Sequence, residues 1–130
     1  MSVMPPPRKS LAPGDVVTVN LPSHQPAGRE QEGYRPAVVV GVPSLAGPVR
    51  FPVVIIVPLT TDSGQSWAVA HPVLYPVLAA GAGGLPVASI CLADQVRSLD
   101  LARVHVRRGT LSNPEFEAVS MAVSRALPSC

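Results

Sequence analysis

The sequence has few charged residues, few aromatic residues and only two cysteines. Charged side chains make up 14% of the 130 residues and aromatic side chains 4%. The low charge, together with a hydrophobic content of 47%, excludes a chain that is disordered throughout. Cys91 and Cys130 cannot build a disulfide framework or a cysteine-liganded metal site. We therefore expect a globular protein of a reducing compartment without a cysteine-liganded metal. No cofactor is expected.

The chain also lacks a recognisable secretory signal. Prolines occupy positions 5–7, where a signal peptide would have its apolar core. Residues 72–93 carry no charge and are long enough to cross a bilayer, but they include three prolines and three glycines. Two of these prolines and the three glycines would cost a helix roughly 9 kcal/mol in its interior. We therefore predict a cytoplasmic protein without a membrane segment, in which this stretch forms two strands and a glycine-rich turn.

Proline and glycine are abundant, with 16 and 10 copies, and they divide the chain into short pieces. Because proline disrupts a helix, this pattern favours strands and loops. We interpret residues 1–13 as a flexible tail and residues 60–72 as a polar, mobile loop. Apolar and β-branched runs predict strands at residues 15–21, 34–42, 51–59, 73–78, 87–92 and 94–100.

One helix is predicted, towards the C-terminal end. Ser112 and Glu115 match a capping box, and Pro114 suits the first helical turn. Apolar residues then recur at helical spacing, at Phe116, Val119, Ala122, Val123, Ala126 and Leu127. The expected fold is mainly β (α+β): a small barrel of short strands covered by this C-terminal helix.

The formal net charge of +2 permits a polyanionic ligand without requiring one. The positive charge is unevenly distributed, because Arg103, His105, Arg107 and Arg108 fall within one short stretch. This stretch is either a solvated surface or a contact for a nucleic acid.

Five short segments occur in an order and spacing that resemble the MazF/PemK toxin family. Gly-Asp-Val-Val begins at residue 14, Glu-Gln-Glu-Gly-Tyr-Arg-Pro at residue 30, and Val-Pro-Leu-Thr-Thr at residue 57. Asp-Gln-Val-Arg-Ser-Leu-Asp begins at residue 94, and Gly-Thr-Leu-Ser leads into the predicted helix from residue 109. Each segment alone is weakly specific, but five in register form a specific pattern over residues 14–127.

The resemblance implies a small SH3-like, PemK-type barrel, a single domain over residues 14–130 that forms a homodimer. It also implies a sequence-specific, metal-independent endoribonuclease that cleaves single-stranded RNA (mRNA) and is inhibited by a cognate antitoxin. By matching motif positions, it implies that the catalytic residues are Arg35, Thr60 and Glu30. The same matching implies RNA-binding roles for Gln95 and Arg97, and Thr61 is a second hydroxyl beside Thr60.

Those residue types suit RNA cleavage, in which a 2′-hydroxyl attacks the adjacent phosphorus and leaves a cyclic phosphate and a 5′-hydroxyl. A guanidinium can donate two parallel hydrogen bonds to a phosphate, so Arg35 can hold the phosphoryl oxygens as they gain charge. Thr60 can add a hydroxyl hydrogen bond. Because the start of one antiparallel strand meets the end of the next at one sheet edge, we expect Arg35 and Thr60 to reach the same phosphate.

The groups that move protons are less clearly indicated. Glu30 could accept the 2′ proton, or it could form an ion pair with the neighbouring arginines. His24 and His71 offer an imidazole alternative outside the family motifs. Tyr34, like Trp67, could stack on an RNA base or pack within the protein.

Two other functions fit a barrel of this size. One is a CcdB-like toxin that binds DNA gyrase, and the other is a non-catalytic SH3-type binding module. The gyrase-binding activity is associated with a C-terminal tail that contains tryptophan, whereas this chain ends in Leu-Pro-Ser-Cys. Cleavage of RNA in EDTA would distinguish the ribonuclease from both alternatives.

Overall fold

The computed structural model describes residues 11–22 and 33–127 of the chain. Within them, seven strands form one antiparallel sheet in the order β4-β5-β3-β2-β1-β7, and β6 also pairs with β3. The strands are β1 (Asp15–Leu21), β2 (Gly33–Gly41), β3 (Val53–Thr61), β4 (Val77–Leu78), β5 (Ser89–Cys91), β6 (Arg97–Asp100) and β7 (Val104–Thr110). The α-helices are α1 (Ser66–Ala70) and α2 (Asn113–Ala126), and short 3₁₀ turns are η2 (Pro43–Ala46), η3 (Ala82–Gly84), η4 (Ala93–Gln95) and η5 (Leu101–Arg103).

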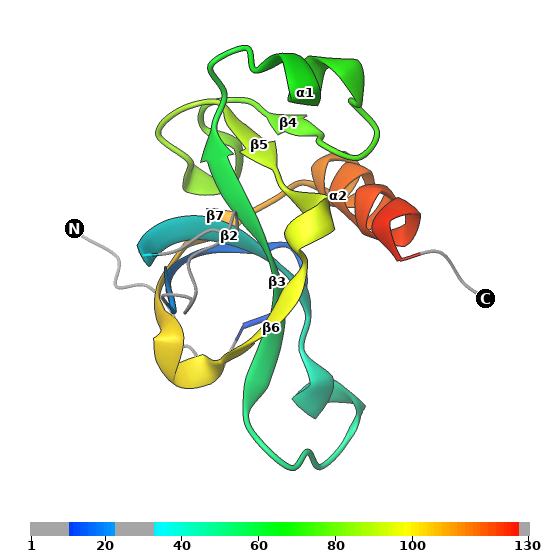
Figure 1. The fold of residues 1–130 in the computed structure, drawn as a ribbon. Coiled ribbons are helices and arrows are strands. Elements are labelled where there is room, and N and C mark those ends of the chain that lie inside the picture. The colour runs from blue at the N-terminus through cyan, green and yellow to red at the C-terminus, as the bar shows by residue number, and fades with distance from the viewer. Residues whose placement is uncertain (1–10, 23–32, 128–130) are drawn as a thin grey trace.

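Strand β3 organises this sheet because it pairs with three other strands. Its first half lies between β2 and β6, where Ile56 is opposite Val39 on one side and Arg97 on the other. Its last three residues pair with β5. Figure 1 shows β3 running from the barrel, formed with β1, β2, β6 and β7, up to the layer that contains β4, β5 and α1.

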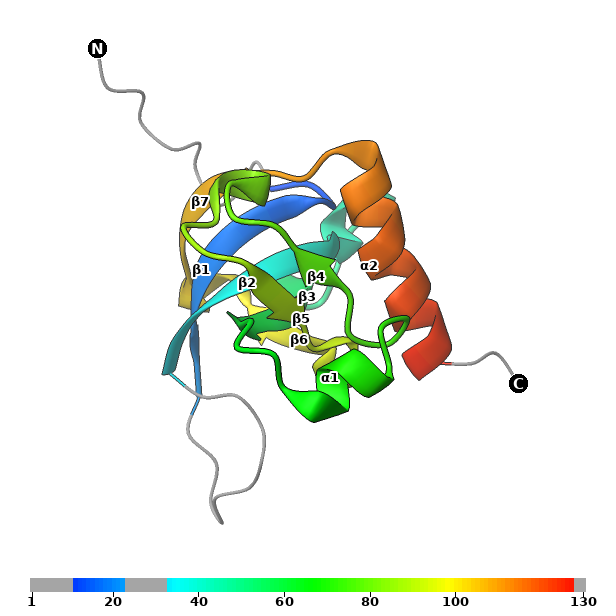
Figure 2. The same cartoon turned by 90° about the horizontal axis from the view of Figure 1, so that it is seen from above.

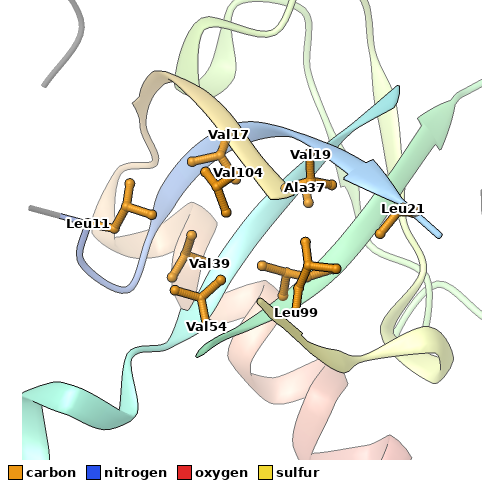
Figure 3. Packing of buried hydrophobic residues seen from close by; sticks show 10 residues of the cluster. Leu11, Val17, Val19, Leu21, Ala37, Val39, Val54, Leu99 and Val104 are labelled. Atoms are coloured by element: carbon orange, nitrogen blue, oxygen red, sulfur yellow. The ribbon is translucent and has the colours of Figure 1, made fainter. Parts of the chain in front are cut away.

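The continuous apolar runs in β2, from Ala37, and in β3 follow from burial on both faces of these strands. Alternate residues of β1, β2 and β3 fill the barrel interior together with Leu99 and Val104, and Figure 3 shows these side chains converging. The remaining apolar residues face a second cluster under α2, which includes Val16, Val38 and Val57. The sequence prediction of a mainly β barrel is therefore confirmed.

Helix α2 begins and packs as its sequence predicts. Ser112 accepts a hydrogen bond from the backbone of Glu115, and the Glu115 side chain accepts one from the backbone of Ser112. Val119 and Ala122 are fully buried, and Phe116 packs partly buried against the second cluster. Figure 2 shows α2 lying along one side of the sheet.

Three sequence predictions need correction. The strand expected at residues 73–78 is reduced to β4, because only its last two residues pair with β5. The loop expected at residues 60–72 begins within β3 and contains helix α1. The basic stretch, for which no helix or strand was predicted, lies in η5 and in strand β7, beside β1. Leu11, assigned to the tail, is only 4% exposed and belongs to the barrel core.

Candidate active site

The candidate site lies where β2 and β3 separate. Their pairing ends with Ala37 opposite Pro58, and two more residues in the same register would bring Arg35 opposite Thr60. Instead, Thr60 pairs with Ile90 of β5 on the other edge of β3. Since β5 occupies that far edge, the β2-facing edge of β3 beyond Pro58 borders a gap between the two strands.

A pocket of about 170 Å³ occupies this gap. Arg35 lines it from β2, and Thr60 and Thr61 line it from the end of β3. A single water molecule needs only about 10–15 Å³ of such space, so the pocket is large enough for a phosphodiester group. The structure thus brings together three of the residues that the sequence singled out.

The chemistry of the pocket suits an anion. Its polar lining consists of the guanidinium-bearing residues Arg35 and Arg108 and three hydroxyl residues, Thr60, Thr61 and Ser89. No carboxylate or imidazole belongs to the lining contributed by the described residues. Guanidinium and threonine hydroxyl groups can donate hydrogen bonds to phosphate oxygens, so the pocket offers donors to a phosphate. Leu59, Leu85, Pro86 and Val87 add an apolar wall.

Two lining residues, Arg108 and Ser89, were not among the sequence-predicted site residues. Arg108 comes from β7, and its Nε donates a hydrogen bond of 2.8 Å to the Oγ1 of Thr18 on β1. Ser89 is 2% exposed and its Oγ donates to the carbonyl oxygen of Val87 at 3.0 Å. The basic stretch was the only sequence signal for Arg108, and nothing in the sequence indicated Ser89.

Cys91 lies behind the pocket, paired with Leu59 in the sheet. It is fully buried, and this burial raises the pKa of its thiol to about 12. The thiol therefore remains protonated at neutral pH, and Cys91 is not a suitable nucleophile.

Other sequence-predicted site residues do not line this pocket. Tyr34 is 65% exposed and its ring contacts that of His105, with the ring centres 4.9 Å apart. Gln95 ends η4, and Arg97 lies opposite Ile56 in the barrel half of β3. Glu30 lies outside the described residues.

The histidine and tryptophan alternatives lie elsewhere in the molecule. His24 is outside the described residues, and His71 borders a different pocket together with Arg125. Trp67 packs edge-on against Tyr75, with the ring centres 5.0 Å apart. The described part of the chain therefore contributes no imidazole to the pocket between β2 and β3.

Residues 11–22 and 33–127 contain no group of three or more His, Cys, Asp or Glu side chains that could hold a metal ion. Within the same ranges, no helix has the length and hydrophobicity needed to cross a bilayer.

Comparison with known proteins identifies relatives of the fold. The family model for PemK-like, MazF-like toxins of type II toxin–antitoxin systems matches residues 12–127. MazF from Deinococcus radiodurans is structurally similar, with a TM-score of 0.68 and 24% sequence identity over 90% of this chain and 96% of that chain. The Mycobacterium tuberculosis toxin MazF-mt6 has a TM-score of 0.61 and 15% identity over 87% of this chain and 95% of its own.

A third similar structure is an endoribonuclease from a mycobacterial species in complex with its cognate antitoxin. Its TM-score is 0.63 and its identity 17%, over 91% of this chain and 95% of that chain. No curated protein matches the sequence significantly.

Proposed function

The chain belongs to the family of PemK-like, MazF-like toxins of type II toxin–antitoxin systems, and on this premise we propose that it is an endoribonuclease. Its substrate is single-stranded RNA, including mRNA, which it cleaves in the cytoplasm at short sequence motifs without a metal ion. The observation that carries the proposal is the pocket lined jointly by Arg35 and Thr60, with further hydroxyl and guanidinium groups around it.

In this proposal, Arg35 donates two hydrogen bonds to the non-bridging oxygens of the scissile phosphate. Negative charge builds on these oxygens as the 2′-oxygen attacks, so the interaction is stronger in the transition state than in bound RNA. Thr60 donates its hydroxyl to the same oxygens, and Thr61 is a second hydroxyl at the pocket edge. The bond from phosphorus to the 5′-oxygen breaks, and the 5′-oxygen takes up a proton from solvent, while the group that accepts the 2′ proton later returns it to solvent. The products are a 2′,3′-cyclic phosphate and a 5′-hydroxyl.

The proton acceptor in this proposal is Glu30. It precedes Arg35 by five residues, so it belongs to the segment that leads into β2. The described lining of the pocket supplies no carboxylate or imidazole that could take the 2′ proton. Gln95, Arg97 and Tyr34 are proposed to contact RNA on either side of the cleaved position, because a single-stranded substrate extends beyond one phosphate.

The test is to incubate the pure protein with RNA of mixed sequence in EDTA and to compare it with Arg35→Ala and Arg35→Lys variants. We expect discrete cuts with cyclic phosphate ends. The Arg35→Ala variant should lose about 10²- to 10³-fold in the cleavage rate, as when one preorganised donor to a transition-state oxyanion is removed. The Arg35→Lys variant should recover little activity, because lysine lacks the planar fork of donors.

Circular dichroism and thermal unfolding provide the control that both variants fold. Intact RNA with the wild-type protein would contradict the proposal, and inhibition of gyrase in the same preparation would support the CcdB-like alternative. Equal cleavage by wild-type and Arg35→Ala proteins would refute the assignment of Arg35.

We further propose that a cognate antitoxin neutralises this protein. The similar structures include a MazE–MazF complex from Deinococcus radiodurans, with a TM-score of 0.62 and 24% identity over 90% of this chain and 95% of that chain. An antitoxin that occupies the pocket should abolish RNA cleavage at a one-to-one ratio of binding sites. Binding without inhibition would place the antitoxin contact away from the pocket.

A homodimer is also part of the proposal. Large apolar side chains remain exposed on the single chain, among them Val69 at 70%, Leu127 at 61% and Met121 at 52%. Apolar residues mark an association site where they form one surface, whereas single exposed apolar residues are ordinary, so a measurement of the oligomeric state decides this part of the proposal. Sedimentation should give a dimer at micromolar concentration, and a monomer there would contradict this part.

A further inference from the structure

Arg108 is held in a fixed position at the edge of the pocket. Its Nε donates a hydrogen bond of 2.8 Å to Thr18 Oγ1, although the two residues are 90 positions apart in the sequence. Arginine carries five N–H donors, so this bond leaves the four donors of the two terminal nitrogens for another partner. The side chain is thus oriented by β1 while its residue lines the same pocket as Arg35.

The backbone of Arg108 is fixed by close packing against a glycine-rich turn. A Cβ atom added to Gly84 would lie 2.6 Å from the carbonyl oxygen of Arg108, and one added to Gly109 would lie 2.8 Å from the backbone of Gly83. Only glycine permits this approach. Figure 2 shows η3 lying beside β7. The next residues after η3, Leu85 to Val87, form the apolar wall of the pocket.

The two neighbouring arginines of β7 have different environments. Arg107 lies 3.7 Å from the buried carboxylate of Asp15, which also accepts a hydrogen bond from Thr110. Arg108 is exposed, and among the residues that the structure describes it has no acidic partner. Arg107 therefore neutralises a buried charge of the fold, whereas the positive charge of Arg108 is presented at the pocket.

We propose that Arg108 is a substrate-binding residue that contacts an RNA phosphate next to the scissile one. This inference rests on the proposed function. In the sheet, β1 lies between β2 and β7. Arg35 is opposite Val19, whereas Arg108 lies between the residues opposite Val16 and Val17. The two backbones are therefore about two strand spacings apart across the sheet, roughly 10 Å, and two to three residues apart along it, roughly 7–10 Å. Two guanidinium groups that reach inward from such a separation suit two successive phosphates of one strand. Arg35 then stabilises the reacting phosphate, and Arg108 sets the register of the strand in the pocket.

The test measures binding of an uncleavable RNA, with 2′-O-methyl groups throughout, to the wild-type protein and to Arg108→Ala. Loss of one charged hydrogen-bonding partner should weaken binding by about 10- to 100-fold at low salt. The slope of log affinity against log salt should fall in magnitude by about 0.7, the value for one phosphate contact on a single strand. With cleavable RNA, KM should rise and kcat should change little.

Three further variants make the result specific. Arg50→Ala removes the same charge from an exposed position that packs over Phe51 outside the pocket, so it should leave the affinity nearly unchanged. Arg108→Lys keeps the charge and should restore most of the salt slope. Thr18→Val removes only the orienting hydrogen bond and should weaken binding less than Arg108→Ala does, without changing the slope.

Several outcomes would overturn the proposal. Equal affinities and slopes for Arg108→Ala and Arg50→Ala would show that Arg108 does not contact RNA. A fall in kcat at unchanged affinity would instead assign Arg108 to the scissile phosphate. If the wild-type protein binds the RNA but never cleaves its cleavable form, the endoribonuclease assignment fails and the Arg108 measurement still stands by itself.

Discussion

The two ends of β3 belong to one continuous strand but have opposite surroundings. Near its start, Val54 and Ile56 are enclosed by β2, β6 and the barrel interior, and they are at most 1% exposed. At its end, Thr60 and Thr61 pair with β5 and border a polar pocket, because β2 no longer follows the strand. A single strand therefore supplies both the core of the barrel and one wall of the site.

This difference indicates that the first half of β3 contributes to the stability of the fold, whereas its end contributes to catalysis. Side chains in the barrel half contribute through buried apolar area, and they are surrounded on all sides. Side chains at the end of the strand are positioned by the same rigid backbone but remain accessible to a ligand. Substitutions in the barrel half of β3 should therefore change stability, and substitutions at its end should change the rate of RNA cleavage.

The largest expected effect is on stability, from Ile56→Ala in the barrel half. Ile56 is fully buried, and truncation of such a residue leaves a cavity that costs about 2–5 kcal/mol in the free energy of unfolding. Urea unfolding should show a lower midpoint. At a temperature where the variant remains folded, the rate of RNA cleavage should be close to that of the wild type.

Ile55→Ala is the matched control, because Ile55 is its neighbour in the sequence and is only partly buried. It should lower the free energy of unfolding by less than Ile56→Ala does. If the Ile56→Ala protein, while still folded, lost cleavage rate in proportion to its loss in free energy of unfolding, the two ends of β3 would not have separate roles.

The next effect is on chemistry, from Thr60→Val at the end of the strand. Valine keeps the shape of threonine but removes the hydroxyl, so a hydrogen bond to the phosphoryl oxygens is lost. We expect about a 10-fold lower rate in single-turnover cleavage, equivalent to about 1.4 kcal/mol. Unfolding by urea should be nearly unchanged.

Thr60→Ser tests whether the hydroxyl of Thr60 is the group that supports cleavage, because serine retains the hydroxyl and lacks only the methyl group. Its cleavage rate should stay within about threefold of the wild-type rate, a difference of roughly 0.7 kcal/mol. A serine variant as slow as the valine variant would assign Thr60 a packing role.

The sequence predicted those parts of the fold whose cause is local. The bounds of β1 agree residue for residue, because its β-branched sequence follows a proline and a glycine at positions 13–14 and precedes a proline and a polar sequence. The start of α2 agrees because both partners of the capping box lie within four residues. The strand β7 was missed, since Arg107 and Arg108 find Asp15 and Thr18 at positions about 90 residues away.

The candidate site was predictable to a similar extent. The family resemblance singled out Arg35 and Thr60, and their positions at neighbouring strand ends were enough to expect them together. Both line one pocket. Arg108 could not be assigned to it, because β7 reaches the pocket from the far side of β1. Ser89 could not be assigned to the site either. Its place at the pocket depends on the pairing of the short strand β5 with β3, which forms only in the folded chain.

The smallest expected effect is on stability, from Tyr75→Phe. Tyr75 lies in the segment between β3 and β5, and a hydrogen bond joins it to η4. The hydroxyl of Tyr75 donates to Asp94 at 2.6 Å. This hydrogen bond, with burial and the negative charge of Asp94, raises the pKa of Tyr75 from 10.0 to about 12. A raised pKa means that the stabilisation is complete below pH 10.0 and disappears as the pH rises through about 12. Since Asp94 is exposed, Tyr75→Phe should lower the free energy of unfolding by at most about 1 kcal/mol at neutral pH.

The titration can be measured directly, because Tyr34→Phe leaves Tyr75 as the only tyrosine of the two in the chain. The ultraviolet absorbance of tyrosinate should then increase with a midpoint near pH 12. Adding Asp94→Asn removes the negative charge and should return the midpoint towards 10.0. A midpoint near 10.0 while Asp94 is intact would mean that this bond does not hold in solution. The end of β3 would then be positioned by its pairing with β5 and by the packing of Ala68 against Ile90.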